Sequence, residues 1–127
     1  MSPTSLKSAL VLCAALFGPI GTASAMGLTF EWGPTTSCFD PKSPPIKLSD
    51  VPKGTKELRF SMVDLDAPDF KHGGETKSYA GKASLPYGSF HYKGPCPPSP
   101  HTYEISIAAL GSGGKVLAEA KARKRFP

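Results

Sequence analysis

Residues 58–68 read LRFSMVDLDAP, and they give the clearest indication of the fold. Leucine, phenylalanine and methionine alternate here with arginine and serine, which is the two-residue period of a β-strand with one buried face. Val63 falls on the polar side, so we expect that side to be partly covered. Pro68 has no N–H for a sheet ladder and ends the pattern. The stretch therefore predicts a strand that finishes at Asp64 and is followed by a polar turn.

A second clear strand is predicted over residues 102–110, where Tyr103, Ile105 and Ile107 share one face. Weaker strand patterns cover residues 28–32, 46–48, 78–85 and 87–92, and loops are predicted over 33–45, 69–76 and 94–100. The segment after the glycine turn, 115–127, has a composition that favours helix and an alternating pattern that favours strand. We favour a strand there, with a helix as the alternative.

The composition agrees with a small, turn-rich β protein. The 127 residues include 13 glycines and 14 prolines, well above the ordinary combined usage of about 12%. Long helices tolerate neither residue in their interior, which excludes a helical bundle. A hydrophobic fraction of 39% and a charged fraction of 20% exclude a highly charged disordered chain and a membrane bundle. The length predicts one domain.

The N-terminus has the layout of an export signal. Lys7 precedes an apolar run over residues 9–20, and the small residues Thr-Ala-Ser-Ala then end at Ala25. We therefore predict that residues 1–25 are a signal peptide, cleaved after Ala25, and that residues 26–127 form the mature domain. A buried N-terminal helix is the alternative, which the two glycines and the proline near the end of the run disfavour. The compact signal indicates a bacterial periplasmic or secreted protein, with no transmembrane segment in the mature chain.

Cleavage would remove Cys13 and leave two cysteines, Cys38 and Cys96. In an oxidising compartment two cysteines can form one disulfide bond, and this one would close a long loop of the chain. We expect this bridge, and the alternative is two separate thiols.

Polar residues suited to chemistry gather in two segments. The first segment, at and after the end of the first clear strand, contains Asp64, Asp66 and His72. The second, on either side of residues 94–100, contains His91, His101 and Tyr103. The ends of adjacent antiparallel strands lie about 4.8 Å apart. We therefore expect Asp64, His72 and His101 to meet in one pocket, where imidazoles can donate hydrogen bonds to phosphate-like oxygens.

Other chemistry is not indicated. There is no His-x-x-x-His or Cys-x-x-Cys spacing, so we expect no metal ion. There is no Gly-x-Ser-x-Gly elbow and no phosphate-cradling loop, so we expect no cofactor and assign no catalytic residue. The basic residues within 121–125 are expected to form a solvated face, and nucleic acid is not expected as a partner.

These segments resemble the motifs of the phosphatidylethanolamine-binding protein family, and within it the bacterial YbhB/YbcL-like, or Raf kinase inhibitor-like, branch. The family's Asp-Pro-Asp-Ala-Pro motif is similar to DLDAP at residues 64–68. Its Tyr-x-Gly-Pro-x-Pro-Pro-x-Gly-x-His-x-Tyr motif is matched in order by Tyr92, Gly94, Pro95, Pro97, Pro98, His101 and Tyr103. Residues 43–45 and 51–56 resemble two upstream segments, so the resemblance spans about residues 37–110.

The chain departs from the family pattern mainly by being shorter. Gly73 follows His72 where the family has tryptophan, and Thr102 stands where arginine is frequent. Ser-Pro at residues 99–100 replaces a glycine, and the segment between His72 and Tyr92 is short. The sequence thus resembles a trimmed member of the family with a shallower pocket.

The resemblance implies a mostly β, Greek-key β-sandwich with little or no helix outside the signal peptide. It also implies binding of a small anion or a phospholipid headgroup. The pocket would be formed by Asp64, Asp66, Pro68, His72, Gly94, Pro95, His101 and Tyr103. The alternative is a protein-interaction module, such as a protease inhibitor, with a vestigial pocket. Because the family is not generally catalytic, we expect no enzyme activity.

Overall fold

The computed structural model describes Pro3, Cys13 and residues 25–127. The predicted signal peptide therefore lies almost entirely outside the described residues. Within the part of the chain that is described, no helix has the length and apolar character needed to cross a membrane.

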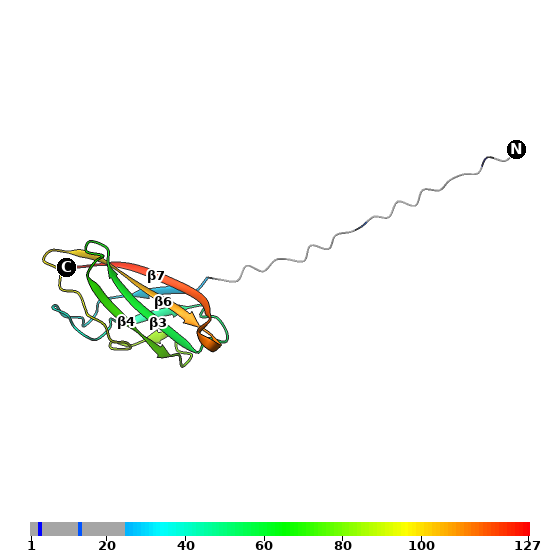
Figure 1. Ribbon diagram of the computed structural model, residues 1–127, viewed down its shortest axis with the longest axis horizontal. Coiled ribbons are helices and arrows are strands. Elements are labelled where there is room, and N and C mark those ends of the chain that lie inside the picture. The colour runs from blue at the N-terminus through cyan, green and yellow to red at the C-terminus, as the bar shows by residue number, and fades with distance from the viewer. Residues whose placement is uncertain (1–2, 4–12, 14–24) are drawn as a thin grey trace.

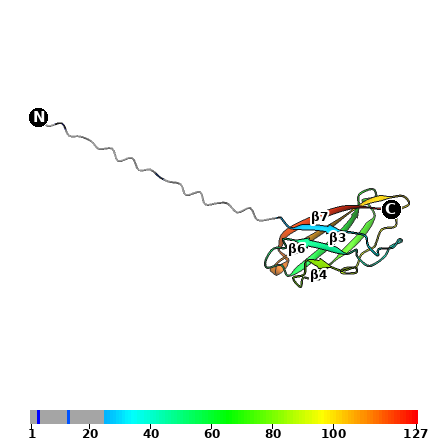
Figure 2. The same ribbon diagram turned by 180° about the vertical axis from the view of Figure 1, so that it is seen from behind.

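The domain consists of two antiparallel sheets, as the alternating sequence patterns predict. The smaller sheet has the strand order β1-β2-β5, with β1 at Gly27–Phe30, β2 at Ile46–Ser49 and β5 at Ser84–Leu85. The larger sheet has the order β4-β3-β6-β7, with β4 at Lys71–Ser78, β3 at Glu57–Asp64, β6 at His101–Leu110 and β7 at Val116–Phe126. Figures 1 and 2 show the long strands of the larger sheet running side by side along the domain. A 3-10 turn at Ser112–Gly114 is the one helical element in residues 25–127, so the prediction of a mostly β fold is confirmed.

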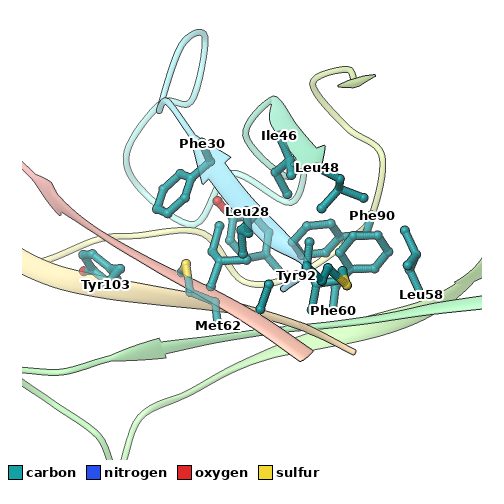
Figure 3. Packing of buried hydrophobic residues seen from close by; sticks show 14 of the residues in the cluster. Leu28, Phe30, Ile46, Leu48, Leu58, Phe60, Met62, Phe90, Tyr92 and Tyr103 are labelled. Atoms are coloured by element: carbon teal, nitrogen blue, oxygen red, sulfur yellow. The ribbon is translucent and has the colours of Figure 1, made fainter. Parts of the chain in front are cut away.

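The core lies between the two sheets. Every second side chain of β3 and β6 is buried, and these side chains meet the buried faces of β1 and β2 (Figure 3). The fully buried members of this layer include Leu58, Phe60, Ile105 and Ile107. The alternation of the sequence is thus explained by one face that packs inward and one face that meets water.

The pairing of β3 with β6 decides where the polar residues go. The register runs antiparallel from Glu57 opposite Leu110 to Asp64 opposite Tyr103. The end of β3 therefore lies beside the beginning of β6, as the sequence predicted. His101 pairs on its other side with Phe126 at the end of β7.

The C-terminal segment is a strand, which confirms the preferred prediction over the helical alternative. β7 pairs with β6 along its whole length, and Ala120 and Phe126 on its inner face are buried. Tertiary pairing overrides the helix propensity of its alanine, lysine and arginine residues. The outer face of β3, predicted to be partly covered, is exposed at Arg59, Ser61 and Val63, and Val63 itself is 38% exposed.

The prediction of a loop over residues 69–76 is wrong, because Lys71–Ser78 forms the strand β4. This edge strand has no alternating pattern, and His72 is its one buried residue. β4 is held by backbone hydrogen bonds to β3 alone, so its side chains need no alternating pattern that the sequence could reveal. Gly74 lies so close to β3 that a Cβ there would overlap the carbonyl oxygen of Phe60.

The strands predicted over residues 78–85 and 87–92 are also largely wrong. The first shrinks to the two-residue strand β5, and the second is an irregular segment with a single bridge between Lys42 and His91. Residues 40–45 lie beside this irregular segment and contain three prolines, which have no N–H to donate to a sheet ladder. The Ser43 side chain replaces one missing bond by accepting from the Phe90 backbone N–H at 3.1 Å. Phe90 is buried all the same, because its ring stacks on Phe60 with centroids 4.4 Å apart.

Candidate ligand-binding site

A small cavity of about 140 Å³ lies at the end of the sandwich where β3 ends and β6 begins. We call this the pocket end. The cavity is lined by Phe39, Asp64, Ala67, Phe70, His72, Cys96, Pro97, Pro98, His101 and Tyr103. The side chains that converge here come from three parts of the chain far apart in sequence: residues 39, 64–72 and 96–103.

Asp64 and His101 form a buried ionisable pair in this cavity. His101 Nδ1 donates to Asp64 Oδ2 at 2.7 Å, and Asp64 is only 4% exposed. The other oxygen, Oδ1, accepts from the backbone N–H groups of Asp66 and Ala67 at 2.9 and 3.1 Å. Burial raises the pKa of Asp64, but the hydrogen bonds and the nearby imidazole outweigh burial and hold the pKa below its usual value. Asp64 is therefore an ionised, fully hydrogen-bonded carboxylate that orients the imidazole of His101.

His72 is the second imidazole of the pocket, and β4 positions it from the opposite side. Its Nδ1 lies 2.6 Å from the carbonyl oxygen of Lys93 and donates to it, which leaves Nε2 as the remaining ring nitrogen. The ring packs edge-on against Tyr103 with centroids 5.4 Å apart. Two imidazoles with fixed orientation thus line one cavity.

Tyr103 closes the inner wall of the pocket. The side chain is almost completely buried, and burial, reinforced by the negative charge of Asp64, raises its pKa far above the ordinary value. Its hydroxyl is therefore neutral and keeps its proton for hydrogen bonding. The pocket combines one neutral hydroxyl, two imidazoles and one compensated carboxylate.

The outer wall of the pocket is held by a disulfide bond between Cys38 and Cys96, with Cα atoms 4.5 Å apart. The prediction of this bridge is confirmed. Gly94 N–H also donates to the Asp40 carbonyl at 3.0 Å, and a Cβ at Gly94 would overlap that carbonyl. The two loops at the mouth are therefore joined both covalently and through a close backbone contact that requires glycine.

Asp40 organises the loop that carries Cys38, a role that no sequence pattern indicated. Its buried carboxylate accepts from the Tyr87 hydroxyl at 2.6 Å and from the backbone N–H groups of Thr36 and Lys42 at 3.1 and 3.0 Å. Burial raises the pKa of Asp40, but these hydrogen bonds outweigh it and hold the pKa below its usual value. Asp40 is thus an ionised anchor beneath the pocket wall.

The eight residues predicted for the site occupy different places. Four of them line the cavity: Asp64, His72, His101 and Tyr103. Asp66 lies at the edge, where its Oδ2 accepts from the Thr102 backbone N–H at 2.7 Å.

The other three predicted residues do not line the cavity. Pro68 is exposed in the turn after β3, and Gly94 and Pro95 are buried in the loop contact behind the wall. The motif therefore includes residues that shape the loops as well as residues that face the pocket.

Sequence reasoning missed two aromatic residues of the lining, Phe39 and Phe70. Phe70 lies in the segment wrongly predicted as a loop. Phe39 follows Cys38, so the predicted disulfide was a signal that Phe39 would come near residues 94–100.

Asp64, Asp66 and His101 place potential ligand atoms within 4.8 Å of one another, and they are the one such group in the described chain. Two carboxylates and an imidazole suit a divalent cation, whereas the sequence spacing predicted no metal ion. In this structure the same atoms are engaged in the hydrogen bonds that fix the turn and orient His101.

A larger hollow of about 480 Å³ lies against the smaller sheet and is bordered by Glu31, Lys47 and Pro86. Size alone would favour this hollow as a binding site. Its one acidic lining residue, Glu31, is exposed and pairs with Lys124 at the surface, whereas Asp64 of the smaller pocket is buried and hydrogen-bonded to His101. We therefore locate the candidate site at the pocket end.

Comparison with known proteins gives the same fold. No family model and no curated protein matches the sequence. Among solved structures, a phosphatidylethanolamine-binding protein homologue from Chlamydia trachomatis is similar, with a TM-score of 0.61 and 22% identity over 81% of this chain and 97% of that chain. Escherichia coli YbcL, described as a member of the mammalian phosphatidylethanolamine-binding protein family, is similar with a TM-score of 0.62 and 19% identity over 81% of this chain and 98% of that chain. The chain therefore has the fold of the phosphatidylethanolamine-binding protein family, as its motifs predicted.

Proposed function

We propose that this protein binds a small phosphorylated headgroup in the pocket and acts after export from the cytoplasm. The observation that carries the proposal is the buried Asp64–His101 pair beside His72. Nδ1 of each imidazole donates to an oxygen, the Asp64 carboxylate for His101 and the Lys93 carbonyl for His72, so Nε2 points in a fixed direction. When the ring is protonated, Nε2–H can donate to a phosphate oxygen. Two such imidazoles in a cavity of about 140 Å³ fit a group of headgroup size.

The charges favour a zwitterionic headgroup over a bare anion. The charge of Asp64 is already compensated by His101 and two backbone N–H groups. Asp66 is exposed at the edge and has a carboxylate oxygen within 4.8 Å of the pair, where an ammonium group can bind. Phosphoethanolamine carries both a phosphate and an ammonium group. The solved structures with this fold are described as phosphatidylethanolamine-binding proteins, which supports the same ligand class.

Binding is proposed in preference to catalysis. Among the described residues that line the cavity there is no serine, threonine or lysine, and the one cysteine is in a disulfide bond. The lining thus offers acid–base groups without an activated nucleophile beside them. Export is supported by the disulfide bond, which is typical of oxidising compartments.

Titration calorimetry with phosphoethanolamine tests the proposal. We expect His101→Ala to weaken binding at least about tenfold, because a hydrogen bond to a charged group contributes about 1.5–3 kcal/mol. His91→Ala is the matched control, since His91 is exposed outside the pocket and pairs with the half-buried Glu75. Equal affinity of wild type and His101→Ala, or no binding by wild type, would overturn the proposal and favour the protein-interaction alternative.

A further inference from the structure

The mouth of the pocket exposes two phenylalanine side chains. Phe39 is 43% exposed and Phe70 is 40% exposed, and both belong to the lining of the cavity. Their rings stack at 5.8 Å with an interplanar angle of 16°. We call Phe39, Phe70 and the adjacent Lys93 the rim patch. Large aromatic rings left in water beside a polar cavity are typical of an interaction surface.

The rim patch is held in place by its surroundings. Phe39 lies between Cys38 of the disulfide bond and the anchor Asp40, and its backbone N–H donates to the Pro95 carbonyl at 3.4 Å. The ring of Phe70 packs on His72 at 4.7 Å. The two rings therefore stay exposed in a fixed arrangement and do not fold back into the core.

Lys93 adds a positive charge to the same surface. Its ammonium group lies 5.3 Å from the ring centroid of Phe39 and 5.2 Å from that of Phe70. Next to Phe70 in sequence, Lys71 and Asp69 are both exposed. Residues 26–127 have a net charge of +4, because Lys7 is the one charged residue before them. The aromatic rings thus lie on a basic protein with a lysine above them.

We propose that the rim patch docks on the surface of a phospholipid bilayer and brings the pocket to its headgroup at the membrane. This inference rests on the proposed function. Aromatic rings insert between headgroups at the boundary of the acyl chains, and lysine binds the anionic lipid phosphates around them. Both rings line the cavity and are exposed beside it, so a bound headgroup would keep its acyl chains in the bilayer.

Co-sedimentation with vesicles of phosphatidylethanolamine and phosphatidylglycerol in equal parts tests the inference. We expect Phe39→Ala/Phe70→Ala to lower the partition constant by about tenfold, because each half-inserted ring loses part of its burial free energy. Val116→Ala/Leu117→Ala is the matched control. These apolar side chains are similarly exposed, 44% and 37%, but lie in the strand that follows the β6–β7 turn.

Three outcomes would overturn the inference: wild type does not bind the vesicles, the rim variant binds as well as wild type, or the control variant loses as much. If the protein binds a monomeric short-chain phosphatidylethanolamine but no vesicles, the inference is also overturned, and the partner of the rim patch is a single soluble lipid molecule.

Calorimetry with phosphoethanolamine separates this inference from the proposed function. Lys93→Ala removes the positive charge of the rim patch, and its side chain does not line the cavity. This variant should bind vesicles more weakly but keep wild-type affinity for the soluble headgroup, whereas His101→Ala should lose that affinity. Wild-type affinity for phosphoethanolamine together with failed vesicle binding would contradict the docking surface alone. Failed phosphoethanolamine binding would contradict the proposed function.

Discussion

The two ends of the sandwich are built from the same strands but held together differently. At the pocket end, where β3 ends and β6 begins, side chains make the connections: the Asp64–His101 pair, the Asp40 anchor and the Cys38–Cys96 bridge. At the opposite end, which we call the hairpin end, the β6–β7 turn is closed by backbone hydrogen bonds. Gly111 N–H donates to the Lys115 carbonyl at 2.7 Å, and Gly114 N–H donates to the Gly111 carbonyl at 3.1 Å.

This difference separates the residues that the fold needs from those that a site needs. A hairpin turn requires only glycines that accept unusual backbone angles, and many sequences provide it. The pocket end places ionised groups and hydrophobic rings side by side, which requires particular side chains. Substitutions at the pocket end should therefore cost more stability than comparable substitutions at the hairpin end.

The largest effect is expected from removing the disulfide bond. The bridge joins cysteines 58 positions apart, and chain entropy assigns about 4 kcal/mol to a closed loop of that size. We expect Cys38→Ser/Cys96→Ser to lower the free energy of unfolding by up to this amount in a guanidinium titration. Reduced wild type should unfold at the same midpoint as the variant. A variant as stable as oxidised wild type would contradict the prediction.

A pair of glycine substitutions compares the two ends directly. At Gly94 a Cβ would overlap the Asp40 carbonyl, and we expect Gly94→Ala to cost about 1–3 kcal/mol because backbone must shift. At Gly113 a Cβ has no neighbour within 4 Å, but φ is +69°, so Gly113→Ala should cost about 1 kcal/mol. Urea denaturation of both variants measures the difference. An equal loss of stability at the two positions would contradict the prediction that the backbone contact at Gly94 is more costly to disturb than the positive φ at Gly113.

The smallest effect is expected from pH, and the two buried carboxylates of the pocket end should contribute most of it. Asp40 and Asp64 have pKa values below their usual range in the folded protein. Their contribution to stability is therefore complete above the unfolded pKa, about 3.9, and is lost as pH falls through the folded pKa. Denaturation midpoints measured from pH 5 downwards should fall less steeply in Asp64→Asn than in wild type.

Asp50→Asn is the control for the pH prediction. Asp50 is exposed and follows β2 at the hairpin end, so its substitution should leave the pH profile unchanged. Identical profiles for wild type and Asp64→Asn would contradict the assignment of the pH dependence to the pocket.

The sequence predicted the parts of the fold in which one face of a strand is buried. β3 and β6 carry clear alternation, and their adjacent ends explain why Asp64 and His101 were expected together. β4 was missed, because an edge strand held by backbone pairing needs no side-chain pattern. The prediction of a strand around Phe90 was wrong, because an aromatic side chain buried by ring stacking cannot be distinguished in the sequence from one buried in a sheet.

The candidate site was predictable only in part. The order of the motifs indicated His72, His101 and Tyr103 as site residues. It could not distinguish these cavity-lining residues from Gly94 and Pro95, which are buried in the loop contact outside the cavity. The exposure of the rim patch left no signal, because exposed aromatic residues form no periodic pattern along the chain, and only the predicted disulfide bond indicated the position of Phe39. Its position depends on loop contacts between segments far apart in sequence.

The position of Trp32 makes intrinsic fluorescence sensitive to the pocket end. It is the single tryptophan of the chain, its indole N–H donates to the Arg125 carbonyl at 2.8 Å, and its ring meets Tyr103 edge-on at 5.7 Å. Indole emission depends on the immediate surroundings of the ring, and Tyr103 is shared between Trp32 and the cavity. Intrinsic fluorescence excited at the indole band therefore records events at the pocket end, while circular dichroism averages over both sheets. The protein carries its own unlabelled reporter within one side chain of the candidate site.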